Sequence, residues 1–307
     1  MMKEILMNLD KIVPLQEKPE TPYQTSITIP CLKFRWIHAQ CFQFELPGGK
    51  VLMTDPFFPQ HPKAWKEKTT PPLTTAELGR VDYVTINHSH FDHTANLPDV
   101  FQNNRPTVIC DRIFARELSA AFHIPEACIH PIVPGLSYHF EDFMLNTFSG
   151  NHTDLGTVSN FDGGELFADP RNPAIGPLNS YGCLYNTNYA FTLKNGFSIG
   201  FAAGVDLTDL REAWRTCKPG LLLRQRIATT TAEKYAEECR SLGAQLVLPM
   251  HQDASSSENC DMNLFTQRVN EKFALENHTA RMFNPKRLQW YSLESRICLS
   301  EKAEDLF

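Results

Sequence analysis

Three histidines and an aspartate fall within six consecutive residues, 88–93, directly after an apolar run. The run has the composition of a buried strand, and alternation along it places His88 and His90 on the same side of the backbone. The turn that follows can bring Asp92 and His93 toward a second position close by. In a purely structural role such imidazoles would repel one another or lie idle. The segment therefore predicts a metal site at a strand end, with ligands for two adjacent ions.

The composition is that of a globular enzyme-sized chain of 307 residues, of which 42% are hydrophobic. The 29 basic and 35 acidic residues give a net charge of −6 and form no basic patch, which disfavours a nucleic acid partner. No segment has the length of a membrane span, and the first residues lack the apolar core of a secretion signal. The nine scattered cysteines contain no Cys-x-x-Cys pair. We therefore expect a soluble, cytoplasmic protein with reduced thiols.

The first 30 residues differ from the rest, because four prolines interrupt them and hydrophobic periodicity is weak. We interpret residues 1–30 as an irregular extension and residues 31–307 as one domain, since no linker stands out. Strict alternation predicts strands over 32–36 and 42–44, with a hairpin that ends near Asp55.

Strands and helices alternate after the histidine segment, which indicates a layered α/β fold. Helical composition over 95–102 and 111–122 flanks an expected strand at 107–110. The segment 154–185 is rich in Gly, Pro and Asn and has no periodicity, so we expect a long loop over a functional site.

The second half carries a hairpin signal, Asn195-Gly196, between apolar runs at 189–193 and 197–201. Thr230 and Glu233 predict a capping box at the start of a helix. Residues 245–248 are expected to form a strand and residues 288–291 to close the second sheet. A last helix, around 261–275, is expected to bury one face. The positions predicted to face inward are Leu264, Phe265, Val269 and Phe273.

Three further candidate ligands, His152, Asp206 and His251, also follow apolar strands. Strand ends converge at one edge of a layered α/β fold, so residues far apart in sequence can meet there. A lone histidine after a strand is more often a surface residue. The repeated position at strand ends is what makes these three candidates for the same metal site.

The order of His-x-His-x-Asp-His after a strand resembles the signature of the metallo-β-lactamase superfamily, whose members are mostly hydrolases with a two-metal site. The resemblance implies an α/β fold, a four-layer αββα sandwich of two mixed sheets flanked by helices. It also implies a set of site residues. The first metal would be held by His88, His90 and His152, and the second by Asp92, His93 and His251, with Asp206 bridging and Asp55 supporting a ligand histidine.

The implied chemistry follows from these residue types. Imidazole and carboxylate bind zinc well, and two close cations lower the pKa of a shared water until hydroxide exists near neutral pH. In this interpretation the bridging hydroxide is the nucleophile and Asp92 orients it. Zinc is the default ion, with Mn²⁺ and Fe²⁺ compatible with the same N and O ligands. Asp206 departs from the family pattern, because Val205 separates it from Gly204, and Asp209 is the alternative.

The resemblance extends to segments 38–40, 54–58, 78–84 and 248–251, which look like the branch that contains L-ascorbate-6-phosphate lactonase and N-acyl-phosphatidylethanolamine phospholipase D. The expected function is a metal-dependent hydrolase of a small ester, lactone or phosphorylated metabolite. The alternatives are a phosphodiesterase of the same fold and a non-catalytic metal-bound scaffold. Relatives often form homo-oligomers, but the sequence identifies no interface. The candidate substrate-binding residues are His38, Arg171 and Tyr181.

Overall fold

A computed structural model describes residues 13–14, 26–58, 73–152, 178, 182, 186–215, 218–227, 229–252 and 261–298. The alternating N-terminal segments form an eight-stranded sheet in the order β1-β15-β2-β3-β4-β5-β6-β7. Its strands β4 to β7 are parallel neighbours, so their carboxyl ends lie at one edge. The strands of this first sheet are β1 (Val13–Pro14), β2 (Ser26–His38), β3 (Cys41–Glu45), β4 (Val51–Thr54), β5 (Tyr83–Thr85), β6 (Thr107–Asp111), β7 (Ile129–Ile132) and β15 (Tyr291–Cys298).

A second, seven-stranded sheet has the order β14-β13-β12-β11-β10-β9-β8. The Asn195-Gly196 hairpin joins β10 to β11 as predicted, with Gly196 at a φ of 80°. The strands of this sheet are β8 (Ser137–His139), β9 (Phe143–Gly150), β10 (Asn186–Leu193), β11 (Ser198–Ala202), β12 (Leu221–Gln225), β13 (Leu246–Met250) and β14 (Arg281–Met282).

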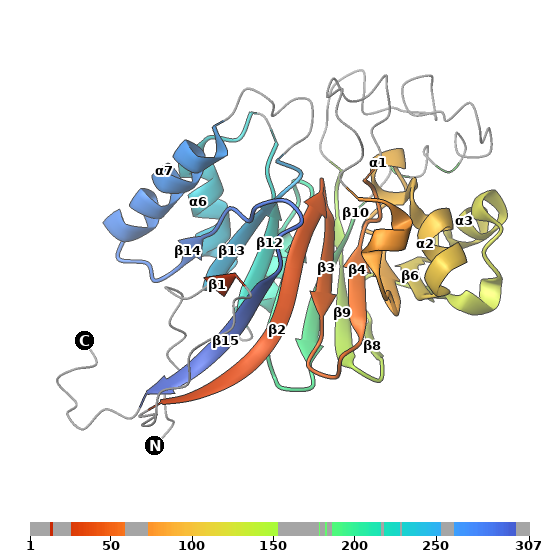
Figure 1. Cartoon of the computed structure of the whole chain (residues 1–307). Coiled ribbons are helices and arrows are strands. Elements are labelled where there is room, and N and C mark those ends of the chain that lie inside the picture. Colours follow the sequence, from red (N-terminus) through yellow and green to blue (C-terminus); the bar gives the residue numbers. More distant parts are fainter. Residues whose placement is uncertain are drawn as a thin grey trace.

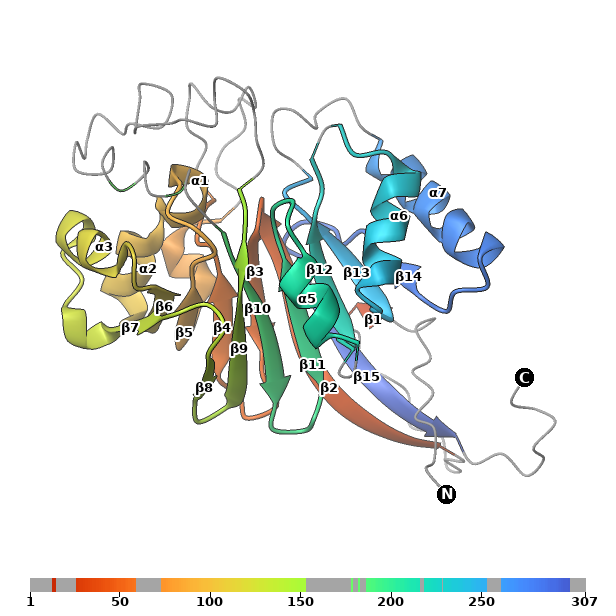
Figure 2. The ribbon, with the colours of Figure 1, turned by 180° about the vertical axis from the view of Figure 1, so that it is seen from behind.

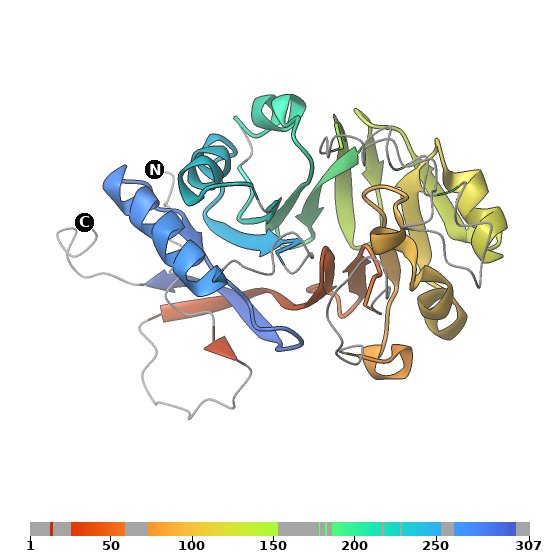
Figure 3. The same cartoon turned by 90° about the horizontal axis from the view of Figure 1, so that it is seen from above.

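Helices cover the outer face of each sheet, which gives the four-layer αββα sandwich that the sequence predicted. Figures 1 and 2 show α6 and α7 on one side of the molecule and α2 and α3 on the other, and Figure 3 shows the same layers from above. Among the described residues no helix is both long and apolar enough to cross a bilayer. The helices are α1 (Phe91–Thr94), α2 (Leu97–Asn104), α3 (Ala115–Phe122), α5 (Thr208–Ala213), α6 (Ala232–Ser241) and α7 (Met262–Leu275), with short 3-10 turns at Thr75–Leu78 and Glu126–Cys128.

Strands β12 and β13 of the second sheet are buried on both faces because each face meets a different layer. Leu221 and Leu223 of β12 pack between the two sheets, together with Phe44 of the first sheet. Leu222, between them in sequence, points to the outer core that α6 and α7 cover. A strand buried on both faces reads as a continuous apolar run rather than as an alternation.

Strand β2 begins at Ser26. The last five residues of the predicted irregular extension, 26–30, are therefore part of this strand. Residues 26–30 pair with β15 in an antiparallel register that starts at Ser26 and Cys298. Pro30, which lacks an amide hydrogen, pairs with Glu294 at a register shift, where a missing ladder bond is tolerated. The assignment of 31–307 to one domain remains a prediction.

The prediction that residues 288–291 close the second sheet is wrong. Strand β15, which begins at Tyr291, lies in the first sheet between β1 and β2. Tyr291 pairs with Phe34 of β2, and the two rings stack with centroids 5.4 Å apart. Both residues belong to the core between the sheets. Local composition near Tyr291 indicates a strand but cannot say which sheet it joins.

Two details of the predicted helices also differ. The α6 N-cap is Thr231 and not Thr230, because the Thr231 side chain accepts the amide of Lys234. On α7, Leu264 is exposed whereas Phe265 and Phe273 are buried. One residue turns an α-helix by about 100°, so Leu264 lies beside the buried stripe rather than on it.

Leucine-to-alanine substitutions at a buried and at an exposed position should differ in their effect on the free energy of unfolding. Leu223→Ala leaves a cavity between the sheets and should lower the free energy of unfolding by about 2–5 kcal/mol. Leu264→Ala, on the exposed side of α7, should change it by less than about 0.5 kcal/mol. Urea denaturation followed by circular dichroism measures both. Equal effects would contradict the assignment of the core.

Candidate metal centre

The histidine segment begins where β5 ends, beside the end of its parallel neighbour β4. The Asp55 amide donates to the Thr85 carbonyl at 2.9 Å, which fixes the chain just past both strands. Helix α1 then presents Asp92 and His93 at the upper edge of the sandwich (Figure 1). From the second sheet, His152 follows β9 and His251 follows β13.

Three imidazoles form the first group of candidate ligands. The ring nitrogens of His88, His90 and His152 offer ligand atoms that all lie within 4.8 Å of one another. His88 Nε2 is 3.0 Å from His90 Nδ1, and the His152 ring centroid is 4.9 and 4.6 Å from those of His88 and His90. This set joins both sheets at one point, as the sequence suggested.

A second group surrounds Asp92. His88, Asp92 and His93 also offer ligand atoms within 4.8 Å of one another. The Asp92 carboxylate lies 3.0 Å from His251 Nε2 and 3.7 Å from His93 Nε2. The two groups share His88 and adjoin, so this edge gathers six of the predicted ligands.

Two residues outside the ligand set orient the histidines. Asp55, fully buried at the end of β4, places Oδ2 at 3.1 Å from His93 Nδ1. Its Oδ1 accepts the amide of Asn87 at 2.7 Å. Asn87 in turn donates its side-chain amide to the Thr187 carbonyl, so its Oδ1 is the acceptor that lies 2.8 Å from His88 Nδ1. The Asn87 contact leaves His88 Nε2 available for a metal, and Asp55 faces the Nδ1 side of His93. Asp55 was predicted for this role, whereas Asn87 was missed although it directly precedes the cluster.

The electrostatics favour the protonation states that metals bind. Burial, and then the neighbouring imidazoles, lower the pKa of His88 well below its ordinary value and that of His90 to about 3. For Asp92 burial acts to raise the pKa, but His93 and His251 outweigh it and hold the pKa well below its usual range. Neutral imidazoles beside an ionised carboxylate are a metal-binding donor set.

Asp206 is in neither of these two groups of candidate ligands. Its exposed carboxylate accepts the amide of Thr208, and it belongs to neither group among the described residues. Gly204, at a φ of 69°, turns the chain, and Val205 then donates its amide to the Asn151 carbonyl at 3.1 Å. Because Val205 takes the place directly after the glycine, Asp206 falls at the start of α5. The predicted bridging role therefore has no support in this geometry, and Asp209 is exposed as well.

Of the three residues predicted to contact substrate, only His38 is among the described residues. His38 is buried, with Nδ1 at 3.0 Å from Arg287 Nη2, and the neighbouring Ala39 carbonyl accepts the amide of His251. His38 therefore lies close to the candidate centre. Arg171 and Tyr181 lie outside the described residues.

Two described residues of the predicted lid, 154–185, lie against the cluster. The Ser89 hydroxyl donates to the Leu178 carbonyl at 2.7 Å. Gly182 approaches His90 so closely that an added Cβ would overlap the imidazole ring. This contact requires glycine, which the sequence alone did not single out.

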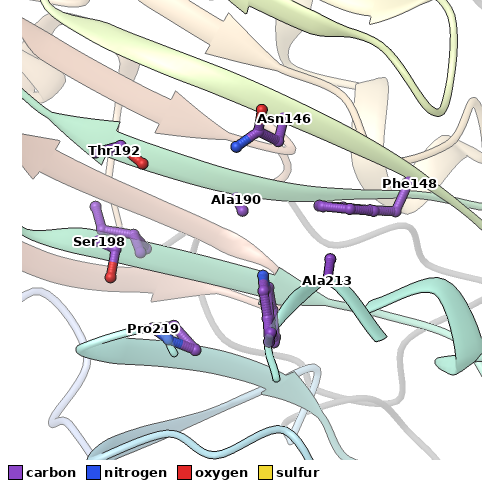
Figure 4. A pocket seen from close by; sticks show the side chains of 9 residues that line it. Asn146, Phe148, Ala190, Thr192, Ser198, Ala213 and Pro219 are labelled. Carbon is purple, nitrogen blue, oxygen red and sulfur yellow. The ribbon is translucent and has the colours of Figure 1, made fainter. Parts of the chain in front are cut away.

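A separate hollow lies on the outer face of the second sheet (Figure 4). Its lining is apolar or weakly polar and includes Phe148 and Trp214, whose ring centroids lie 6.5 Å apart, together with Asn146, Thr192 and Ser198. None of these residues is a metal ligand of the candidate centre.

Comparison with known proteins gives a family and a fold. The family model for the beta-lactamase superfamily domain matches residues 33–203. A UPF0173 metal-dependent hydrolase from Cupriavidus taiwanensis is 26% identical over 191 residues, and the match covers 61% of this chain but only 62% of that relative. The fold resembles Igni18, a metallo hydrolase from Ignicoccus hospitalis (TM-score 0.59, 15% identity, 89% of this chain and 100% of that one). It also resembles an isothiocyanate hydrolase from Delia radicum gut bacteria (TM-score 0.58, 15% identity, 87% and 99%).

The support that Asn87 gives to His88 can be measured as metal affinity. Asn87→Ala removes the acceptor for His88 Nδ1 and should weaken Zn²⁺ binding by about 10–100-fold. Competition with a chromogenic chelator, at a temperature where both proteins are folded, measures the dissociation constant. Asn103→Ala, at an exposed position on α2, is the matched control and should bind zinc as the wild type does. An unchanged affinity in Asn87→Ala would contradict this role.

The lowered histidine pKa values predict how the stability of the metal-free protein depends on pH. The unfolded chain takes up protons at its histidines near pH 6.5, whereas folded His90 resists protonation down to about pH 3. The stabilisation is therefore complete above about pH 6.5 and is lost as pH falls below it. Urea denaturation at several pH values, with metal removed, should show this decline. It should be shallower in His90→Asn and unchanged in His139→Asn, at an exposed site.

Proposed function

Because this chain belongs to the beta-lactamase superfamily, we propose that it is a metal-dependent hydrolase of a small ester, lactone or phosphorylated metabolite. One observation carries the proposal: six side chains with metal-ligand chemistry converge on one edge from both sheets. The name of the Cupriavidus relative, a metal-dependent hydrolase, supports the same activity.

The residues present fit a pair of divalent ions. The six side chains divide into an all-imidazole group and a group with one carboxylate. The lowered pKa values keep His88 and His90 neutral and Asp92 ionised, which are the forms that bind metal. We assign His88, His90 and His152 to one ion. We assign Asp92, His93 and His251 to the other. Nitrogen and oxygen donors of this kind suit Zn²⁺, with Mn²⁺ and Fe²⁺ as alternatives.

Bound divalent ions supply an activated water and polarise a carbonyl or phosphoryl oxygen. The protein's own contribution is positioning. Asn87 holds His88 in one tautomer, and the Asp55 carboxylate faces Nδ1 of His93, so the ligands need little rearrangement. Asp92, kept ionised, is the one carboxylate in the two groups and is the residue we assign to accept a hydrogen bond from the attacking water. The close packing of Gly182 against His90 keeps that side of the site shielded.

Elemental analysis of protein purified without added metal tests the proposal first. We expect about two metal ions per chain, as in binuclear hydrolases, and a loss of metal in His90→Ala. Asp206→Ala is the matched control, because its exposed carboxylate belongs to neither group and the metal content should stay unchanged. A loss of metal in Asp206→Ala would restore the bridging assignment.

A substrate panel then separates the chemical classes. Lactones, carboxylic esters and phosphodiesters are assayed with the metal-loaded protein, and His90→Ala should lose turnover on any active class. Phosphodiesters alone would favour the phosphodiesterase alternative. Stoichiometric metal without turnover on any class would contradict a hydrolase and favour a metal-bound scaffold.

A further inference from the structure

Arg226 is a buried cation for which the described part of the chain provides no counter-charge. Only 4% of its surface is exposed, yet its Nε and Nη1 atoms have no hydrogen-bond partner. A guanidinium keeps its charge in proteins, and burying a charge without a partner is costly. An anionic ligand would complete such a group.

Arg224, two residues earlier, shows what a paired guanidinium in this sheet looks like. It is also buried, at 5% exposure, but its Nη1 donates to the carbonyls of Ala202 and Gly204. Its Nη2 lies 2.9 Å from the Glu238 carboxylate. The fold therefore satisfies one buried arginine completely and leaves its neighbour open.

The backbone of Arg226 lies beside the end of β13, the strand that His251 follows. The Arg226 backbone amide donates to the carbonyl of Met250, the residue directly before His251, at 2.9 Å. Its guanidinium carbon sits 4.8 Å from the centre of the Phe265 ring at the start of α7. Asp261, the N-cap of that helix, is exposed and its Oδ1 accepts two amides of the first turn, and no ion pair joins it to Arg226 among the described residues.

Two buried amides without partners flank the same strand end. Gln252 follows His251 and is 4% exposed, and neither its Oε1 nor its Nε2 has a partner. Gln40 is fully buried with both amide atoms equally open, and it follows Ala39, whose carbonyl accepts the His251 amide. Unpartnered hydrogen-bonding groups thus occur on both sides of His251.

We propose that Arg226, Gln252 and Gln40 form a binding site for an oxyanion, a carboxylate or phosphate group of the substrate, beside the metal centre. The planar guanidinium matches both oxyanions, and the amides add neutral donors. Phe265 covers one face of the guanidinium, so its edge is the part that meets the ligand. The inference rests on the proposed function and narrows it: the hydrolysed ester, lactone or phosphoester carries a negative charge.

Anion binding to the metal-free protein tests this site without relying on hydrolysis. Inorganic phosphate or acetate is titrated at constant ionic strength near pH 8, where free imidazoles are neutral. Thermal unfolding and calorimetry follow binding in the wild type, Arg226→Met and Arg215→Met. Arg215 is the control because it is exposed and pairs only with Glu212 among the described residues.

At saturating anion, the unfolding temperature should rise by about 5 °C in the wild type and in Arg215→Met. Arg226→Met should lose this shift, with at least about tenfold weaker binding. In anion-free buffer the same variant should unfold at the wild-type temperature or above it, because an uncompensated buried charge is gone. A response to phosphate alone would identify a phosphoryl group, and a response to acetate alone a carboxylate.

Two results would overturn the proposal. One is an equal anion response in all three proteins, which places the anion elsewhere. The other is no response in the wild type together with a lower unfolding temperature in Arg226→Met, which makes Arg226 structural. If Arg226→Met does not fold, Gln252→Leu, which retains the arginine, should still weaken anion binding. Neither overturning result affects the metal content of the wild type, so failure here is distinct from failure of the hydrolase proposal.

Discussion

The buried carboxylate of Asp55 is the interaction on which the candidate centre depends. It receives the amide of Asn87 on one oxygen and faces His93 on the other, and Asn87 passes the constraint on to His88. Burial raises the pKa of Asp55, so its ionised form relies on these N–H groups. One side chain at the end of β4 thus couples ligands from both groups, and disturbing it would misplace both.

The centre also depends on how the two sheets pack. The 88–93 segment extends from the first sheet, whereas His152 and His251 extend from the second. Apolar packing between the sheets brings them together, and backbone contacts set the distance: the Thr187 amide of β10 donates to the Asn87 carbonyl at 2.9 Å. The Tyr189 hydroxyl of the same strand donates to the Ile86 carbonyl. A change in the core between the sheets would therefore reach the metal ligands.

The edge that carries the ligands is also where the fold leaves polar groups unsatisfied. Arg224, elsewhere in the second sheet, is paired with backbone carbonyls and with Glu238. This fold can therefore provide partners for a buried charge. Arg226 and Gln252 lack such partners next to His251. Sites that bind ligands commonly hold groups that cost stability until the ligand is present. At the end of β13, partners for these groups would increase stability, whereas ligand binding requires that the groups stay without partners in the free protein.

Local sequence patterns determined much of the secondary structure and the candidate chemistry. Alternation predicted strands, and the spacing of His88, His90 and Asp92 indicated a candidate metal site, because both periodicities are properties of the chain itself. Tertiary structure decided what no local pattern encodes. It placed Tyr291 in the first sheet, made Asn87 a support for His88, and left Asp206 outside both groups of candidate ligands among the described residues. Which strands pair, and where a side chain points after a turn, depends on contacts between residues distant in sequence.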